Sequence, residues 1–135
     1  MIGILLIAHG TLGTSLAHCA SHVMGGAPPL FKQLGVSIDD DPVDLLPRAH
    51  EMVRNLNDEG CGGVLVLSDI YGATPCNIAS RLVSAGRVDG VAGVNLPMLV
   101  RALAYRNLPL DQLVAKVMEG GTAGIVHINK EVETQ

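Results

Sequence analysis

The run Met1-Ile-Gly-Ile-Leu-Leu-Ile-Ala8 decides how the rest of the chain is interpreted, and His9 and Gly10 follow it directly. It is short and almost wholly apolar, with no alternation between apolar and polar positions. Such a run, bounded by turn residues, is typical of a strand buried on both faces of a parallel sheet. Three further runs share this character: residues 63–68, residues 90–94 and, more weakly, residues 34–38.

Between these runs the apolar residues recur at helical spacing, as Leu12, Leu16 and Ala20 do. We expect helices over residues 12–23, 45–56, 77–85, 97–105 and 110–119. The start of the second is uncertain because of Pro47. Strands that alternate with helices predict an α/β fold: an open, mostly parallel sheet with right-handed crossovers and helices on both faces.

The last part of the chain predicts one more short strand, Gly124 to Ile128, placed antiparallel, after a helix stopped by Gly120-Gly121. The length of 135 residues fits a single domain, and no linker or repeat interrupts it. The glycine pair predicts a flexible hinge. A hinge there would let the final strand cross to a second subunit and cover an exposed sheet edge.

Composition and charge argue against several classes of function. Apolar residues make up 48% of the chain and charged residues 16%, so a folded core is expected. The net charge of -4, with scattered basic residues, argues against DNA and anionic membranes as partners. Aromatic residues make up only 2%, too few to stack on the bases of single-stranded nucleic acid. The opening run is far shorter than a membrane span, and no basic segment precedes it, so it predicts neither export nor insertion.

Three cysteines without C-x-x-C spacing predict neither a disulfide framework nor a zinc knuckle, and a reducing cytoplasm fits best. Dinucleotide-binding, P-loop and α/β-hydrolase motifs are missing, so neither nucleotide binding nor α/β-hydrolase chemistry is expected. His18 and His22 lie one helical turn apart without an accompanying carboxylate, which favours a solvated helix face over a metal site. His50 and His127 show no partner in the sequence.

Three loops should meet at the carboxyl edge of the sheet, where ligands collect in open α/β proteins. The first holds His9. Gly10 allows close approach of the backbone there, and the amino end of the next helix favours an anion. These features predict a place where a phosphorylated imidazole would be stabilised. The other two loops are residues 68–74 and 94–97.

Asp69 follows the second strong strand, so it should emerge beside His9 if the two strands are neighbours. A carboxylate there would accept the ring N–H of His9, fix its tautomer and leave the other ring nitrogen as a nucleophile. An aspartate that caps its own turn is the alternative. Thr74-Pro75 predicts a helix N-cap followed by proline at the first helical position, and a capping hydroxyl can also contact a phosphoryl group.

Three ordered motifs carry a resemblance that covers nearly the whole chain. They are Ile7-Ala-His-Gly10, Ser68-Asp-Ile-Tyr-Gly-Ala-Thr-Pro-Cys-Asn-Ile-Ala-Ser80 and Gly93-Val-Asn-Leu-Pro-Met-Leu99. Together they resemble the mannose-family IIA component of the bacterial phosphoenolpyruvate-dependent sugar phosphotransferase system.

The resemblance implies a phosphoryl carrier in the cytoplasm that needs no cofactor. His9 would accept the group from the phosphocarrier HPr and pass it to a IIB partner, with Asp69 orienting the ring and Thr74 lying beside it. It also implies a homodimer that exchanges its terminal strand. A membrane would be involved only through a separate permease.

Other assignments stay open at this point. The phosphotransfer subunit of a dihydroxyacetone kinase has a similar fold and a histidine at a strand end. Small tetrapyrrole metal chelatases also open with a strand followed by the sequence Ala-His-Gly, here residues 8–10, but the two later motifs explain nothing in a chelatase. A third alternative is a non-catalytic interaction module. The sequence does not separate service to a permease from a regulatory role.

Overall fold

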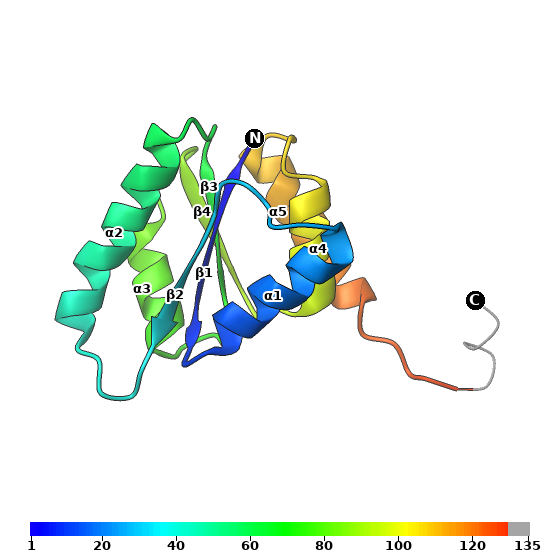
Figure 1. Cartoon of the computed structure of the whole chain (residues 1–135), viewed down its shortest axis with the longest axis horizontal. Coiled ribbons are helices and arrows are strands. Elements are labelled where there is room, and N and C mark those ends of the chain that lie inside the picture. The colour runs from blue at the N-terminus through cyan, green and yellow to red at the C-terminus, as the bar shows by residue number, and fades with distance from the viewer. Residues whose placement is uncertain (130–135) are drawn as a thin grey trace.

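The computed structural model describes residues 1–129, in which strands and helices alternate almost throughout (Figure 1). The strands are β1 (Gly3–His9), β2 (Phe31–Val36), β3 (Val64–Ser68) and β4 (Val88–Ala92). The helices are α1 (Leu12–Met24), α2 (Pro42–Asp58), α3 (Thr74–Leu82), α4 (Leu96–Ala104) and α5 (Leu110–Ala123). Among these residues no helix is both long enough and apolar enough to cross a lipid bilayer.

The four strands form one parallel sheet in the order β2-β1-β3-β4. The central strand β1 is bonded on both sides, with Ile7 opposite Leu34 of β2 and Ser68 of β3. Residues 4–8 are fully buried, because helices cover both faces of the strand. The run of β1 is apolar throughout because both faces of the strand are buried, as the sequence predicts. The predicted open α/β sheet is confirmed.

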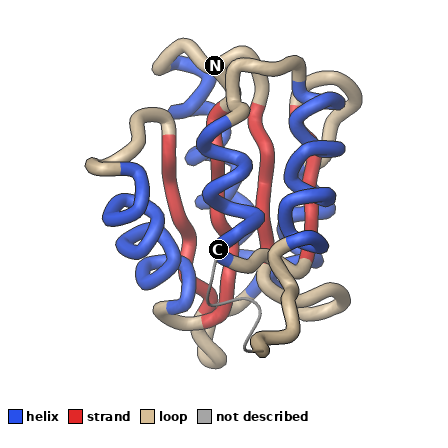
Figure 2. The backbone as a smooth tube through the Cα atoms, turned by 90° about the vertical axis from the view of Figure 1, so that its right-hand side faces the viewer, coloured by secondary structure: helices blue, strands red, loops and turns tan. Residues whose placement is uncertain are grey.

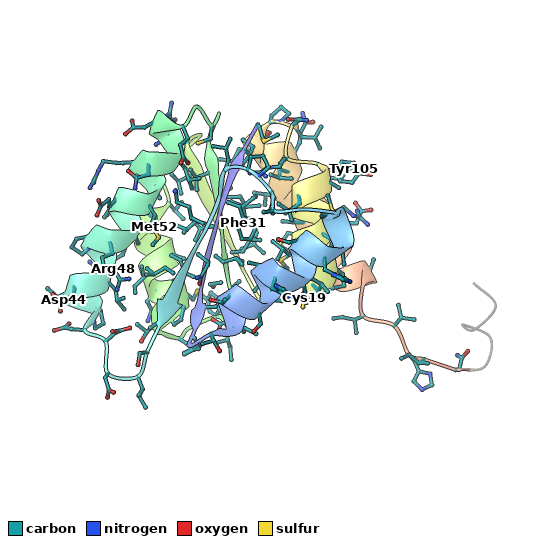
Figure 3. The ribbon with its side chains drawn as sticks, in the orientation of Figure 1. Cys19, Phe31, Asp44, Arg48, Met52 and Tyr105 are labelled. Carbon is teal, nitrogen blue, oxygen red and sulfur yellow. The ribbon has the colours of Figure 1, made fainter. Side chains whose placement is uncertain are left out.

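Two helical layers enclose the sheet (Figures 1 and 2). Helices α2 and α3 cover one face, and α1, α4 and α5 cover the other. Successive residues of β1 alternate between the two cores: Leu5 and Ile7 pack toward α2 and α3, while Ile4 and Leu6 pack toward the other layer. The side chain of Phe31, labelled in Figure 3, is packed against the second core.

Helix α3 and strand β4 lie earlier in the chain than predicted. The helix ends at Leu82, where Val83 is already extended, and not at residue 85. The strand spans Val88–Ala92, whereas residues 90–94 were expected.

The boundaries of α2 and β2 differ as well. Helix α2 begins at Pro42, earlier than expected, because the Asp41 side chain accepts the Val43 N–H and caps the helix. Pro47 then lies inside the helix. Strand β2 begins at Phe31 and ends at Val36, so Ile38, expected in this strand, is 99% exposed.

Arg106 is a buried cation for which the sequence offered no signal. Its guanidinium donates hydrogen bonds to the carbonyls of Ile2, Pro29 and Leu30. Those carbonyls lie just before β1 and β2. Arg106 therefore ties together the starts of two neighbouring strands, far from their carboxyl ends.

The prediction that Gly120-Gly121 stops the last helix is wrong, since α5 continues to Ala123 and both glycines are buried in it. An added Cβ at Gly120 would lie 2.8 Å from Cβ of Arg101, and one at Gly121 would lie 2.8 Å from Cε of Met98. The two glycines thus allow α5 to pack closely against α4, and they do not form a hinge.

Residues 125–129 form no strand in the single chain. Three apolar side chains of this segment, Ile125, Val126 and Ile128, are between 61% and 81% exposed. The described part of the sheet has no antiparallel fifth strand, and β4 is left as an edge. Exchange of this segment between two subunits stays a prediction.

Candidate active site

His9 is the last residue of β1, at the carboxyl edge of the sheet. Gly10 follows with a φ of 54°, a left-handed conformation that glycine adopts without strain, and helix α1 begins two residues later. The N-cap residue Thr11 makes no side-chain hydrogen bond to this helix. The chain therefore turns tightly after His9 and presents the amino end of α1 beside it.

Asp69 comes directly after β3, which lies next to β1 in the sheet. Because the two strands are parallel neighbours, with Ile7 opposite Ser68, Asp69 and His9 emerge at the same edge. The condition that the sequence left open, that these strands are adjacent, is met.

One carboxylate oxygen of Asp69 holds His9 at two points. Its Oδ2 lies 2.8 Å from the ring Nδ1 of His9 and accepts the backbone N–H of His9 at 2.9 Å. The other oxygen, Oδ1, accepts the N–H of Ile70 at 3.0 Å. The carboxylate is thus surrounded by donors and fixed in one orientation. The second contact, from the backbone of His9, had no signal in the sequence.

The electrostatics of the pair favour an ionised Asp69. Burial of the carboxyl raises its pKa, but the hydrogen bonds from the backbone and ring of His9 outweigh burial, so the pKa is lowered from 3.8. An ionised carboxylate cannot donate, so Nδ1 carries the hydrogen that they share. Neutral His9 then has its lone pair on Nε2.

His9 and Asp69 differ in exposure in a way that suits a reacting ring held by a fixed partner. The side chain of His9 is 52% exposed, whereas that of Asp69 is 10% exposed. The histidine can meet a large partner at the surface, while the carboxylate stays behind it. This arrangement can present an unprotonated imidazole nitrogen as a nucleophile.

Thr74 lies one position further into its helix than the sequence predicts. Ala73, with extended backbone at φ -94° and ψ 172°, is the N-cap of α3, and Thr74 and Pro75 are its first two residues. The prediction that Thr74 caps the helix is therefore wrong, since no side chain caps α3. The hydroxyl has no hydrogen-bond partner among residues 1–129, and Thr74 is half-buried at the start of a helix that packs against β1 and β3.

The third loop has a structural task. Asn95 caps α4 by accepting the N–H of Met98, and its amide donates to the carbonyl of Gly121 in α5. Its two polar atoms are thereby used in joining the two helices.

The remaining histidines lie away from His9 along the chain and make no ion pair within residues 1–129. His18 and His22 are exposed on α1, and His127 is exposed beyond α5. His50 is exposed on α2, where it lines a groove against α3. No group of three metal-ligating side chains gathers anywhere in the described part of the chain.

Comparison with known proteins gives a consistent result. A family model described as "PTS system fructose IIA component" matches residues 3–118. The fructose-specific EIIA component of Bacillus subtilis is 31% identical over 121 residues, covering 84% of this chain and 77% of the relative. The mannose-specific EIIAB component of Escherichia coli K12 is 44% identical over 66 residues, which is 47% of this chain but only 20% of that protein.

Solved structures agree in fold. An EIIA component from Streptococcus agalactiae superposes with a TM-score of 0.81 at 26% identity, covering 94% of this chain and 97% of the other. A mannose/sorbose-specific IIA subunit from Enterococcus faecalis gives a TM-score of 0.81 at 22% identity, covering 95% of each chain.

Proposed function

Because this chain belongs to the family of phosphotransferase-system IIA components of the fructose and mannose type, we propose that it carries a phosphoryl group on His9. The group comes from phospho-HPr and passes to a IIB component. The observation that supports this most directly is the contact of 2.8 Å between Nδ1 of His9 and Oδ2 of Asp69, which leaves Nε2 free. The family match does not favour a dihydroxyacetone-kinase subunit or a metal chelatase.

In the proposed transfer, Nε2 of His9 attacks the phosphorus of phospho-HPr. The new N–P bond forms as the donor's N–P bond breaks, and the donor imidazole leaves with the electron pair. The proton on Nδ1 of His9 stays in its hydrogen bond with Asp69. The ring of His9 gains positive charge, which the neighbouring carboxylate stabilises.

The amino ends of two helices support the transferred group. Helices α1 and α3 begin in the loops that follow His9 and Asp69, and neither has a side-chain cap. Apart from Pro75, which has no N–H, their first backbone N–H groups are therefore available to an anion. We assign Thr74 as a further contact, because its unpartnered hydroxyl lies at the start of α3. These groups supply positioning and charge stabilisation.

The surroundings of His9 suit a protein as donor and acceptor. Three exposed apolar side chains stand in loops at the carboxyl edge: Ile38 after β2, and Ile70 and Tyr71 after β3, with exposures of 99%, 56% and 87%. Apolar side chains clustered around a polar site are typical of a protein-docking surface. Both HPr and IIB would dock there in turn.

We further propose that residues 1–135 form one IIA domain that works in the cytoplasm as a homodimer. The support for the dimer is the outer edge of β4, which pairs with no further strand among residues 1–129 and carries only an isolated bridge from Val88 to Ser84, together with the exposed apolar side chains of residues 125–128. Adding this segment to the partner's sheet would cover both.

The decisive experiment is phosphorylation in vitro. The protein is incubated with phosphoenolpyruvate, enzyme I and HPr, and its intact mass is measured before and after mild acid. We expect a gain of one phosphoryl group that acid removes. The His9→Ala variant should gain none, while the control His18→Ala, an exposed histidine on α1, should be labelled like the wild type. Full labelling of His9→Ala would show that the acceptor is another residue.

A further inference from the structure

A groove of about 670 Å³ lies between α2 and α3, which run side by side on one face of the sheet (Figure 1). Its lining comes from one stripe of each helix. The residues are Pro42, Val43, Leu46, Pro47, His50 and Arg54 of α2, and Thr74, Asn77, Ile78 and Arg81 of α3. Apart from Thr74, no residue of this set belongs to the site described above.

The groove has an apolar end and a cationic end. Both helices begin at the carboxyl edge of the sheet and run back along it, so residues early in each helix face one another. Leu46 and Pro47 come early in α2, whereas Arg54 comes near its end. In α3, Ile78 is buried at mid-helix and Arg81 lies in the last turn. The two arginines therefore share the end away from the carboxyl edge.

The charge at this end is not balanced. Arg54 and Arg81 have no ion pair and no hydrogen bond with any residue of the described range, and no aspartate or glutamate lines the groove. Two other arginines are held by partners: Arg106 is bonded to three carbonyls, and Arg101 lies 3.8 Å from Glu119. Arg48 and Arg87 also make no ion pair within residues 1–129, but they do not line the groove. The chain has 13 acidic residues, yet none of those in the described range pairs with the guanidinium groups of Arg54 and Arg81. These two arginines, next to the apolar lining of the groove, are therefore complementary to an anion.

We propose that this groove binds a small amphipathic anion. Its carboxylate or phosphate monoester group would lie on Arg54 and Arg81, and its apolar part against Leu46, Pro47 and Ile78. The volume lies within the range of about 300–1,000 Å³ that is usual for small-molecule sites, and such sites combine an apolar lining with few polar groups. The site goes beyond the proposed function, since it does not use His9.

The test is a titration of uniformly ¹⁵N-labelled, unphosphorylated protein followed by amide shifts in NMR, so its result does not depend on phosphoryl transfer. Four probes separate the contribution of the negative charge from that of the apolar chain. Hexyl phosphate and hexanoate have both, hexanol lacks the charge, and inorganic phosphate lacks the apolar chain. From the binding energy usual per non-hydrogen atom of a small ligand, hexyl phosphate should bind with a Kd of roughly millimolar size.

We expect one or both alkyl anions to shift the amides of α2 and α3 with saturation, and hexanol and inorganic phosphate to bind at least tenfold more weakly. Arg54→Gln and Arg81→Gln should each weaken the alkyl anion at least tenfold. The control is Arg48→Gln, because Arg48 also stands on α2 (Figure 3) but does not line the groove. It should bind like the wild type, and exposed positions such as these tolerate glutamine without loss of folding.

Several outcomes would overturn the proposal. These are no saturable shift by either alkyl anion, equal binding of hexanol, shifts centred on His9 and α1, or binding unchanged by both arginine variants. A hexaglutamate peptide is a fifth probe. If it shifts these helices while both alkyl anions do not, the groove is a docking site for an acidic peptide, and the small-molecule proposal is wrong.

Discussion

Replacement of Asp69 by asparagine tests the proposed link between the carboxylate and His9 most directly. The two oxygens of Asp69 accept three N–H groups: the ring and backbone of His9 at Oδ2, and the backbone of Ile70 at Oδ1. An asparagine amide has one acceptor oxygen and one NH₂ group. In either orientation its NH₂ faces at least one donor, so the shape is kept while the hydrogen-bond pattern fails.

The expected slowing can be worked from that pattern. A hydrogen bond to a charged group contributes about 1.5–3 kcal/mol and a neutral one about 1 kcal/mol, so loss of the charge removes about 1–2 kcal/mol from a positively charged transition state. Each 1.36 kcal/mol is about tenfold in rate. When the NH₂ group faces the ring, Nδ1 becomes the acceptor and the proton moves to Nε2, which disables the nucleophile. We therefore expect His9 phosphorylation to slow by about 10- to 100-fold.

The assay is rapid quench of transfer from ³²P-labelled phospho-HPr, since the chain has no tryptophan to report the reaction. The matched control is Asp111→Asn, an exposed aspartate at the start of α5. Circular dichroism melting shows whether each variant is folded. The reverse transfer to HPr should slow by a similar factor. A folded Asp69→Asn protein that transfers at the wild-type rate in both directions would refute the partnership of the two residues.

Four further predictions concern stability, packing and assembly. Because its pKa is lowered in the folded protein, the Asp69 carboxylate stabilises the fold above pH 3.8, and this stabilisation is lost as the pH falls further. The difference in unfolding free energy between wild type and Asp69→Asn should therefore be larger at pH 6 than at pH 2.5, as measured by urea unfolding. A gap of the same size at both values would contradict this. Gly120→Val should lower stability by about 1–3 kcal/mol, because its side chain would collide with Arg101, and an unchanged melting temperature would show that α4 and α5 adjust freely. Asn95→Ala should cost about 1 kcal/mol in urea unfolding and leave labelling of the protein by phospho-HPr intact; loss of labelling in a folded variant would give Asn95 a part in the reaction. Light scattering should find a dimer for the full chain and a monomer or aggregate after truncation behind Gly124, and a stable full-length monomer at micromolar concentration would overturn the dimer.

The positions of His9 and Asp69 were predictable because each follows a strong apolar run. The carboxyl ends of neighbouring parallel strands meet at one edge, so two local patterns are enough to bring the residues together once the strands are adjacent. The Thr74-Pro75 pattern predicts the N-cap of α3 one residue late, since Ala73 takes the N-cap position through its extended backbone without a side-chain hydrogen bond. The preference of Ser, Thr, Asp and Asn for the N-cap position could not predict alanine there.

Glycine shows most clearly where local reasoning ends. Gly120 and Gly121 have the sequence of a helix stop, yet they lie inside α5 because α4 approaches too closely for any side chain there. The cause is the contact between α4 and α5, which cannot be deduced from the presence of two glycines in the sequence.

The sequence by itself determined the alternation of buried strands with amphipathic helices, and with it the α/β fold and the edge at which His9 and Asp69 stand. These follow from the spacing of apolar residues, which is a local property. Only the tertiary structure decided which oxygen of Asp69 holds the ring, which glycines are packed and which arginines stand unpaired between α2 and α3. Each of these depends on a distance between segments far apart in the chain, and that distance is set by how the layers pack.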